Sequence, residues 1–144
     1  MADIMTVAQR SMLMRQIRGR GNVSTEKRLV RLLGEAKLNG WRRHTAMLGC
    51  PDFVFRQERV VIFVDGCFWH GCPKHFQAPK KRADFWRKKI DGNRLRDRRV
   101  SRFLRQRGWL VIRIWEHGLK GYEASRSLAR IGRALKKRRL CASA

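Results

Sequence analysis

Two segments of the chain are almost entirely apolar and are bounded by polar turns. Residues 60–64 read VVIFV and residues 109–115 read WLVIRIW. A run that is apolar on both faces predicts a central strand covered by helices on either side, because neither face can remain in water. Two shorter strands are predicted over residues 41–45 and 52–55, and the polar turn RQER joins the second of these to residues 60–64.

The helical spacing of apolar residues predicts helices around these strands. The clearest begins near residue 24, ends at Asn39 and Gly40, and carries one apolar stripe formed by Leu29, Leu32, Leu33 and Ala36. Basic helices are predicted over residues 6–18, 83–107 and 122–140; the second is expected to loosen at Gly92 and the third to fray over its final KKRR. This alternation predicts an α/β fold, and the length predicts one domain over residues 1–144.

The balance of charge indicates a polyanionic partner. Lys and Arg number 35 against 11 Asp and Glu, which gives a formal net charge of +24. This exceeds what solubility requires and is typical of proteins that bind nucleic acids. An acidic membrane surface is the alternative partner, but no apolar run reaches the length of a transmembrane helix and no signal-peptide segment is recognisable. We therefore expect a cytosolic protein.

Three potential metal ligands crowd into residues 67–75. Cys67, Cys72 and His75 have the spacing C-x4-C-x2-H, with glycine and proline residues among them to bend the backbone. Thiolate and imidazole are the ligands of a closed tetrahedral zinc site, which needs a fourth. His117 is the preferred fourth ligand because it follows the predicted strand over residues 109–115, and His44 is the alternative. If no metal binds, these cysteines are small buried apolar residues.

A second set of side chains indicates oxygen-ligand chemistry. Asp52 follows Pro51 at the start of a predicted strand, and the next strand ends in Val64 and Asp65. A hairpin between the strands brings two carboxylates and a backbone carbonyl near one point. Phosphodiester hydrolysis needs a divalent cation to shield the phosphate and to lower the pKa of the attacking water, and such oxygens are its ligands. The alternative is an ordinary turn in which Asp52 bonds its own backbone.

One histidine and three aromatic residues complete the candidate site. His70 lies among the cysteines but outside their spacing, so it is available to orient or deprotonate a water; otherwise it is a further ligand or a loop residue. Phe68 and Trp69 stand in the same glycine-bounded loop, and Trp86 stands among basic residues. Exposed aromatic rings in such surroundings can insert between base pairs, whereas core packing is the alternative for both tryptophans.

Four motifs together resemble one known protein family. PDFVF precedes the first apolar strand, CFWHGCPKH follows it, and DFWRKKIDGN-x3-DRR and GWLVIRIWEH come later in this order. From about Thr6 to Lys120 the chain is similar to Vsr, the very-short-patch-repair DNA mismatch endonucleases. The resemblance implies a restriction-endonuclease-like fold related to PD-(D/E)XK nucleases, with a mixed central sheet between helices and a structural zinc site.

The same resemblance implies an activity and its partners. It implies Mg²⁺-dependent nicking of one strand 5′ to the thymine of a T·G mismatch, the product of 5-methylcytosine deamination. The implied partners are double-stranded DNA carrying the mismatch, a functionally linked cytosine-5 DNA methyltransferase, and downstream repair proteins. The chain is expected to act as a monomer near the nucleoid of a bacterial cytosol, without a membrane.

The resemblance also implies roles for individual residues. Asp52 matches the catalytic magnesium ligand, Val64 the position that offers a backbone carbonyl to magnesium, and His70 the catalytic histidine. Asp65 occupies a neighbouring polar position, and Glu26 in EKRL matches an acid near the active site. The structural zinc positions match Cys67, Cys72, His75 and His117, and the intercalating wedge matches Phe68, Trp69 and Trp86.

Two positions depart from the family pattern. His117 stands where a cysteine is common, which keeps a good zinc ligand. Gly49 and Cys50 stand where a basic residue is common, which puts one phosphate or base contact into question. Two alternative functions remain: an endonuclease of the same fold that cuts matched DNA, and a zinc-containing nucleic-acid-binding module without catalysis.

Overall fold

The computed structural model describes residues 23–43 and 45–142, and the helix predicted over residues 6–18 lies outside them. The helical elements are a π-helical turn (Val23–Lys27), α2 (Arg28–Glu35), α3 (Ala83–Gln106), a 3-10 turn (Glu116–Leu119) and α4 (Gly121–Ala142). The strands are β1 (Trp41–Arg42), β2 (Phe53–Phe55), β3 (Val60–Asp65) and β4 (Leu110–Trp115).

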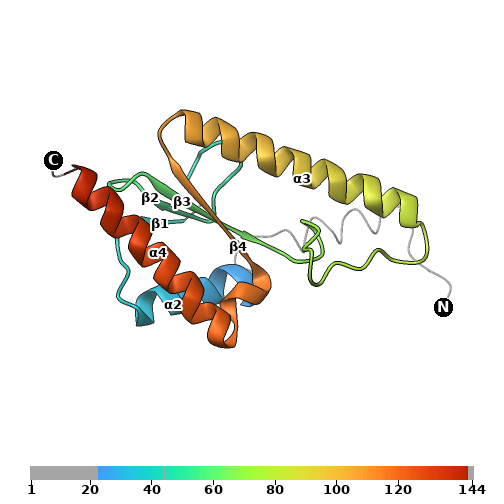
Figure 1. The fold of residues 1–144 in the computed structure, drawn as a ribbon, viewed down its shortest axis with the longest axis horizontal. Helices are drawn as coiled ribbons and strands as arrows, with labels where there is room; N and C mark the ends of the chain where they lie inside the picture. The colour runs from blue at the N-terminus through green and yellow to red at the C-terminus, as the bar shows by residue number, and fades with distance from the viewer. Residues whose placement is uncertain (1–22, 44, 143–144) are drawn as a thin grey trace.

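The strands form one mixed sheet in the order β1, β2, β3, β4 (Figure 1). β2 runs antiparallel to both of its neighbours, β1 and β3, and β2 and β3 form a tight hairpin with Phe55 opposite Val60. β3 and β4 pair in parallel over their full length, which requires a long crossover, and the segment that contains α3 supplies it. The predicted α/β fold is thus confirmed as a mixed four-stranded sheet with helices.

Both faces of the sheet are buried under helices (Figure 1). Because side chains alternate along a strand, Ile62 and Ile112 pack on one face with residues of α2 and α4. Val61 and Val111 pack on the other face against α3. β3 is therefore a central strand covered on both sides, as its continuous apolar run predicts.

Three predicted features of the helices and strands are wrong in detail. β1 contains two residues only, Trp41–Arg42, in place of the predicted residues 41–45. α3 passes through Gly92 without interruption, because the cost of one glycine, about 1 kcal/mol relative to alanine, is small for a long helix that buries Ile90 and Leu104. Ala36 is exposed and leaves the apolar stripe, since α2 ends at Glu35.

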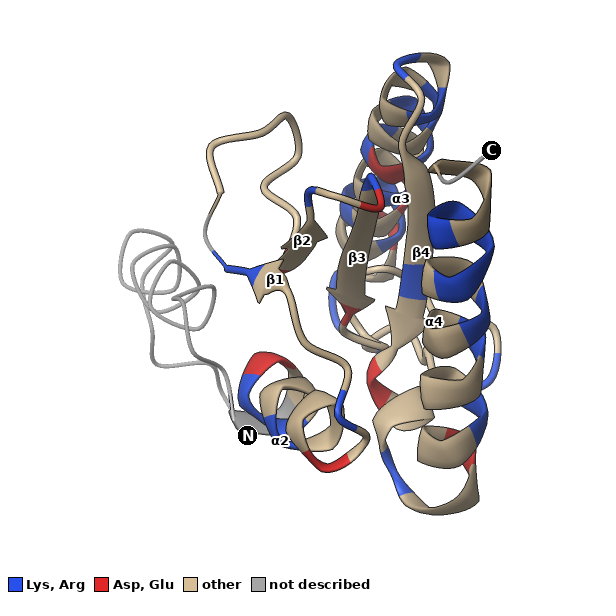
Figure 2. Cartoon of the chain, turned by 90° about the vertical axis from the view of Figure 1, so that its left-hand side faces the viewer, with Lys and Arg blue, Asp and Glu red and all other residues tan. Residues whose placement is uncertain are grey.

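The basic end of α4 is helical, which corrects the prediction that its KKRR sequence frays. Arg139 of this sequence forms an ion pair with Glu58 at 2.8 Å, and the Glu58 side chain in the β2–β3 turn is only 6% exposed. The pair attaches the last turns of α4 to the sheet. Further Lys and Arg residues recur along α4 (Figure 2). Within the described residues, no helix is both long and apolar enough to cross a membrane.

The packing of α4 leads to a first prediction. Leu135→Ala should lower the free energy of unfolding by about 2–5 kcal/mol, because it opens a cavity at a side chain that is 1% exposed. Leu140→Ala on the same helix removes the same atoms from a side chain that is 64% exposed. This change should alter the free energy of unfolding by less than about 0.5 kcal/mol. Urea unfolding of both variants provides the comparison. Equal losses would contradict the packing of α4 described above.

Candidate active site

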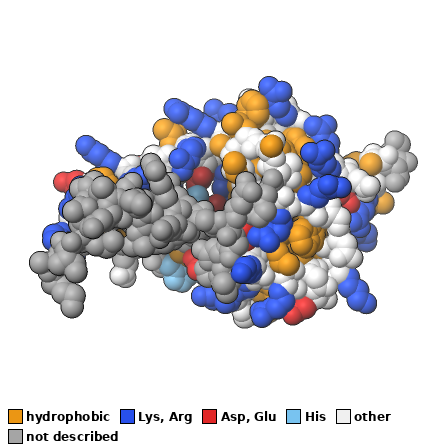
Figure 3. Space-filling view, turned by 180° about the vertical axis from the view of Figure 1, so that it is seen from behind, with side chains coloured by type: hydrophobic (Ala, Val, Ile, Leu, Met, Phe, Trp, Pro, Cys, Tyr) orange, Lys and Arg blue, Asp and Glu red, His pale blue; other side chains and the backbone are white. Residues whose placement is uncertain are grey.

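A hollow of about 290 Å³ opens where β2 begins and β3 ends. Asp52 and Asp65 lie on the side of the sheet that α3 covers, because they continue the alternation of β2 and β3. The walls also include His70 from the following loop, Asp97 from α3 and Arg113 from β4. In the space-filling view, acidic and histidine side chains are visible inside a hollow rimmed by Lys and Arg (Figure 3).

Asp52 is held by the backbone of the neighbouring strand. The Val64 N–H donates a hydrogen bond to Asp52 Oδ2 at 2.7 Å. Burial, with a smaller contribution from the adjacent Glu26 carboxylate, raises the pKa of Asp52 to about 7 against the effect of this bond. The Val64 carbonyl points to the same side of β3 as its N–H, toward Asp52. A cation bound among these oxygens would displace a proton, because it favours the ionised carboxylates.

Glu26 reaches this point from the π-helical turn before α2. Arg43 Nη2 donates to Glu26 Oε2, and both side chains of this ion pair are mostly buried. The structure thus places Glu26 beside Asp52, although the two residues are distant in sequence. Two carboxyl groups and one peptide oxygen form a set of hard ligands suited to a divalent cation such as Mg²⁺.

His70 lies between two other carboxylates. Its Nδ1 donates to Asp97 Oδ2 at 2.5 Å, and Asp65 Oδ1 is 3.7 Å from the same nitrogen. Burial opposes ionisation of Asp97, but the hydrogen bond and charge of His70, together with Arg113 and Arg96, outweigh it and lower the pKa of Asp97. Burial raises the pKa of Asp65, which His70 and Arg113 partly offset. With Nδ1 as donor, Nε2 is the ring nitrogen that can accept a proton.

The predicted soft-ligand residues meet at a separate point. Cys67 Sγ lies 3.3 Å from His117 Nδ1, and Cys72 Sγ lies 3.6 Å from Nδ1 of both His75 and His117. Ligand atoms bound to one tetrahedral zinc at ordinary bond lengths are about 3.6 Å apart for sulfur and nitrogen. All four ligand atoms lie within 4.8 Å of one another, so the residues present fit a zinc ion. His44 lies outside the described residues.

Burial favours the metal-binding form of the histidine in this cluster and disfavours that of the cysteine. It lowers the pKa of His117, with help from the charges of His75 and Lys74, and so keeps the imidazole neutral and able to bind a metal. Burial also raises the pKa of the Cys67 thiol, and the neighbouring Cys72 adds to this against the hydrogen bond from His117. A bound cation would favour the thiolate form of Cys67 against this effect of burial.

The three predicted wedge residues form one aromatic cluster. The ring centroids of Phe68 are 5.1 Å from Trp69 and 5.5 Å from Trp86, and the two tryptophans are 6.0 Å apart. All three side chains are half-buried, and the neighbouring Phe85 is exposed. Asn93 Nδ2 of α3 donates to the Trp69 carbonyl at 2.9 Å and fixes the loop that carries it. The cluster therefore lies at the surface next to His70.

Two residues of the site were not identified from the sequence. Asp97 stands in a strongly basic helix, but Asn93, Asp97 and Ser101 recur at a spacing of four and so share one helix face. A polar stripe on the helix face that packs against a sheet must find polar partners there, and could therefore have indicated the active site. Arg113 is the only charged residue within β4, where a charge must find partners.

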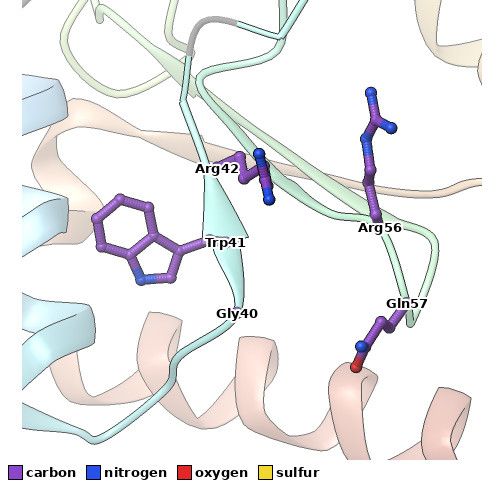
Figure 4. A pocket seen from close by; sticks show the side chains of 5 residues that line it. All are labelled: Gly40, Trp41, Arg42, Arg56 and Gln57. Carbon is purple, nitrogen blue, oxygen red and sulfur yellow. The ribbon is translucent and has the colours of Figure 1, made fainter.

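A second hollow, of about 460 Å³, lies at the opposite end of the β2–β3 hairpin (Figure 4). The side chains of Trp41 and Arg42 point to different sides of β1 there, and Arg56 and Gln57 complete the lining. This lining contains neither a carboxylate nor a histidine. Of these two hollows, the one around Asp52 is equipped for acid-base or metal chemistry.

Comparison with known proteins identifies the family. The family described as "DNA mismatch endonuclease Vsr" matches residues 2–76. The chain is 42% identical to DNA mismatch endonuclease Vsr of Escherichia coli, over 85% of this chain and 79% of that protein. It is 38% identical to the type II nicking enzyme V.XorIIP of Xanthomonas oryzae, over 81% and 85%. It is 33% identical to the type II nicking enzyme V.NmeAIP of Neisseria meningitidis, over 94% and 98%.

Each of these relatives is matched over more than two thirds of its own length, and the segment matched by the family contains Asp52, His70 and three of the clustered sulfur and nitrogen ligands. The chain therefore belongs to the Vsr family and is a DNA endonuclease.

Proposed function

We propose that the protein nicks one strand of duplex DNA 5′ to the thymine of a T·G mismatch, by Mg²⁺-dependent hydrolysis. The observation that carries the proposal is the hollow that Asp52, Val64 and His70 line together, with Glu26 adjacent to Asp52. The name of the Escherichia coli relative supports mismatch specificity, and the formal charge of +24 supports a DNA substrate.

Asp52, Glu26 and the Val64 carbonyl are the groups that would hold the divalent cation. When bound, this cation would shield the phosphate charge and lower the pKa of the attacking water. Asp52 is well suited to the task because its position is fixed by the Val64 N–H. Arg43 orients Glu26 through their hydrogen bond. Its positive charge also offsets part of the negative charge of Asp52 and Glu26.

His70 is the proposed general base. Its Nδ1 bond to Asp97 fixes the ring orientation and leaves Nε2 as the proton acceptor. Asp97 would stabilise the imidazolium that forms when Nε2 takes a proton from water. Asp65, 3.7 Å from Nδ1, adds a second negative charge on the same side of the ring. These assignments give each carboxylate near His70 a role in orientation and charge stabilisation.

Cys67, Cys72, His75 and His117 are the proposed structural zinc ligands. A zinc ion bound there would tie the loop after β3 to the turn after β4, since His117 follows β4. The loop between Cys67 and Cys72 carries both His70 and the aromatic residues Phe68 and Trp69. We infer that the zinc cluster fixes the position of the general base and of the wedge at once.

Phe68, Trp69 and Trp86 are the proposed wedge, which inserts into the duplex beside the mismatch. Opening a base step costs a few kcal/mol, and it costs less where the bases are mispaired. Insertion can therefore favour a T·G pair by deformability as well as by contact. This activity would place the protein, as a monomer, with DNA in the bacterial cytosol, downstream of a cytosine-5 DNA methyltransferase and upstream of further repair proteins.

A strand-resolved nicking assay tests the proposed function. Duplexes with T·G, T·A or C·G at one position are incubated with the protein, with and without Mg²⁺. The proposal expects a Mg²⁺-dependent nick 5′ to the mismatched thymine only. Equal cutting of the T·A duplex would support an endonuclease for matched DNA instead, and binding without any product would support a DNA-binding module.

Asp52→Asn should abolish nicking while the protein still binds DNA. The change removes a negatively charged cation ligand without removing a phosphate contact. Single-turnover nicking and duplex affinity, measured at one salt concentration, separate the two effects. Near-normal turnover of the variant would show that the cation is held elsewhere.

His117→Ala should lower zinc content and thermal stability together, because a structural ion contributes folding free energy through its ligands. Elemental analysis and thermal unfolding measure the two quantities, and Cys141→Ser, at an exposed thiol, serves as the control. Retention of one zinc per chain in the His117 variant would remove this residue from the ligand set.

Trp86→Ala should weaken binding to a T·G duplex by about 1–3 kcal/mol, the scale of lost stacking on a base. If the ring served only the core, truncation would instead cost about 3–5 kcal/mol of folding free energy. Urea unfolding and duplex affinity at fixed salt distinguish these results, since salt alone changes the electrostatic part of affinity. Unchanged affinity with large destabilisation would assign Trp86 to the core.

A further inference from the structure

We propose that Arg113 is a positioning residue that fixes Asp65 and Asp97 around His70. The inference rests on the proposed function, because it assigns Arg113 to the geometry of the same general base. It goes further in one respect: it makes the orientation of His70 depend on a residue of β4 that does not touch the histidine through any described hydrogen bond or ion pair.

The Arg113 guanidinium joins three elements of the fold. Nη1 donates to both carboxylate oxygens of Asp65, at 2.9 and 3.2 Å, which ties β4 to the end of β3. Nε donates to Ser101 Oγ at 2.9 Å, and Nη2 donates to the Asp97 backbone carbonyl at 3.2 Å, which ties β4 to α3. Nη1 is also 3.8 Å from Asp97 Oδ1. All three of its nitrogens are therefore engaged.

The position of Arg113 follows from the strand register. It pairs with Phe63 across the parallel ladder, on the face of the sheet that α3 covers. Its guanidinium stacks over the Phe63 ring, 4.2 Å from the centroid, and its side chain is 22% exposed. A planar, permanently charged fork can stack and donate in several directions, which a lysine ammonium cannot reproduce.

The positive charge of Arg113 reduces the repulsion between the Asp65 and Asp97 carboxylates. Asp65 and Asp97 both approach His70 Nδ1, and two like charges so close would repel each other. By distance alone, Asp65, His70 and Asp97 could also hold a metal ion. The Arg113 guanidinium already supplies a positive charge at hydrogen-bond distance from Asp65. We therefore assign this cluster to orientation of His70 and the oxygen site at Asp52 to the cation.

Without Arg113, Asp65 and Asp97 would lose their shared anchor, and the His70 ring would lose a fixed partner. Displacement of a catalytic group by about 1 Å can reduce a rate by about 10²-fold. The guanidinium nitrogens of Arg113 already donate to Ser101, Asp65 and the Asp97 carbonyl, so DNA affinity should survive the loss of this side chain. A defect in rate with preserved affinity is thus the signature of this role.

Single-turnover nicking of a T·G duplex at saturating protein tests the proposal with three variants. Arg113→Met should nick about 10²-fold more slowly than wild type, with duplex affinity changed by less than about 3-fold. Arg113→Lys keeps the positive charge but lacks the planar guanidinium with its several donors, so it should recover only part of the nicking rate. Arg130→Met is the matched control, because Arg130 donates to the Arg113 backbone carbonyl at 3.0 Å without touching either carboxylate. It should nick within about 3-fold of wild type.

A double variant keeps the proposal testable if Arg113→Met does not fold. Arg113→Met leaves the buried Asp65 carboxylate without its partner, and adding Asp65→Asn removes that charge. The double variant should fold and should nick no faster than Arg113→Met alone. Wild-type rates in a folded Arg113→Met or double variant would overturn the proposal. An equal loss of rate and affinity would overturn it as well, because it would indicate a general structural role.

One measurement does not depend on nicking at all. Nitrogen NMR of the imidazole reports which ring nitrogen carries the hydrogen when His70 is neutral. The proposal expects the Nδ1–H form in wild type and a mixture of both forms in Arg113→Met. The same form in both proteins would refute the role of Arg113, whereas a wild-type protein that nicks no duplex would refute the proposed function only.

Discussion

The parallel pairing of β3 with β4 is the constraint on which the rest of the structure depends. It brings together residues about 50 positions apart in sequence, such as Cys67 and His117, or Asp65 and Arg113. Non-local pairing of this kind is slow to form and costs loop-closure entropy, so the contacts at its end must stabilise it. Here those contacts are a cluster of soft ligands and a network of buried charges.

The structure contains two separate sets of potential metal ligands, one soft and one hard. Sulfur and imidazole nitrogen meet at Cys67, Cys72, His75 and His117, where a closed tetrahedral site fits. Carboxylate and peptide oxygens meet at Asp52, where a hard divalent cation fits. His70 lies in the loop between them, so one short segment connects the loop-fixing cluster with the candidate catalytic oxygens. Strong positive charge elsewhere in the chain allows these few acids to remain close together near a polyanion.

The sequence predicted this arrangement where local pattern was sufficient. The apolar runs identified β3 and β4. Residue types at short spacing indicated Asp52, His70 and the cysteines, which the structure brings into the hollow and into the sulfur and nitrogen cluster. The sequence did not identify Asp97 or Arg113, because their importance comes from a register that joins α3 and β4 to β3. The end of α4 was misjudged for a similar reason, since the partner of Arg139 is a buried glutamate 81 positions away. Long-range charge pairing leaves little trace in local sequence.

Anomalous diffraction from crystals of the zinc-containing protein soaked in Mn²⁺ tests the central claim most directly, because data at the two absorption edges locate each metal separately. The account predicts zinc bound by Cys67, Cys72, His75 and His117, and manganese bound by Asp52 near the Val64 carbonyl. Manganese between Asp65, His70 and Asp97, where the Arg113 guanidinium lies, would contradict it. So would zinc at Asp52 with none at the cysteines.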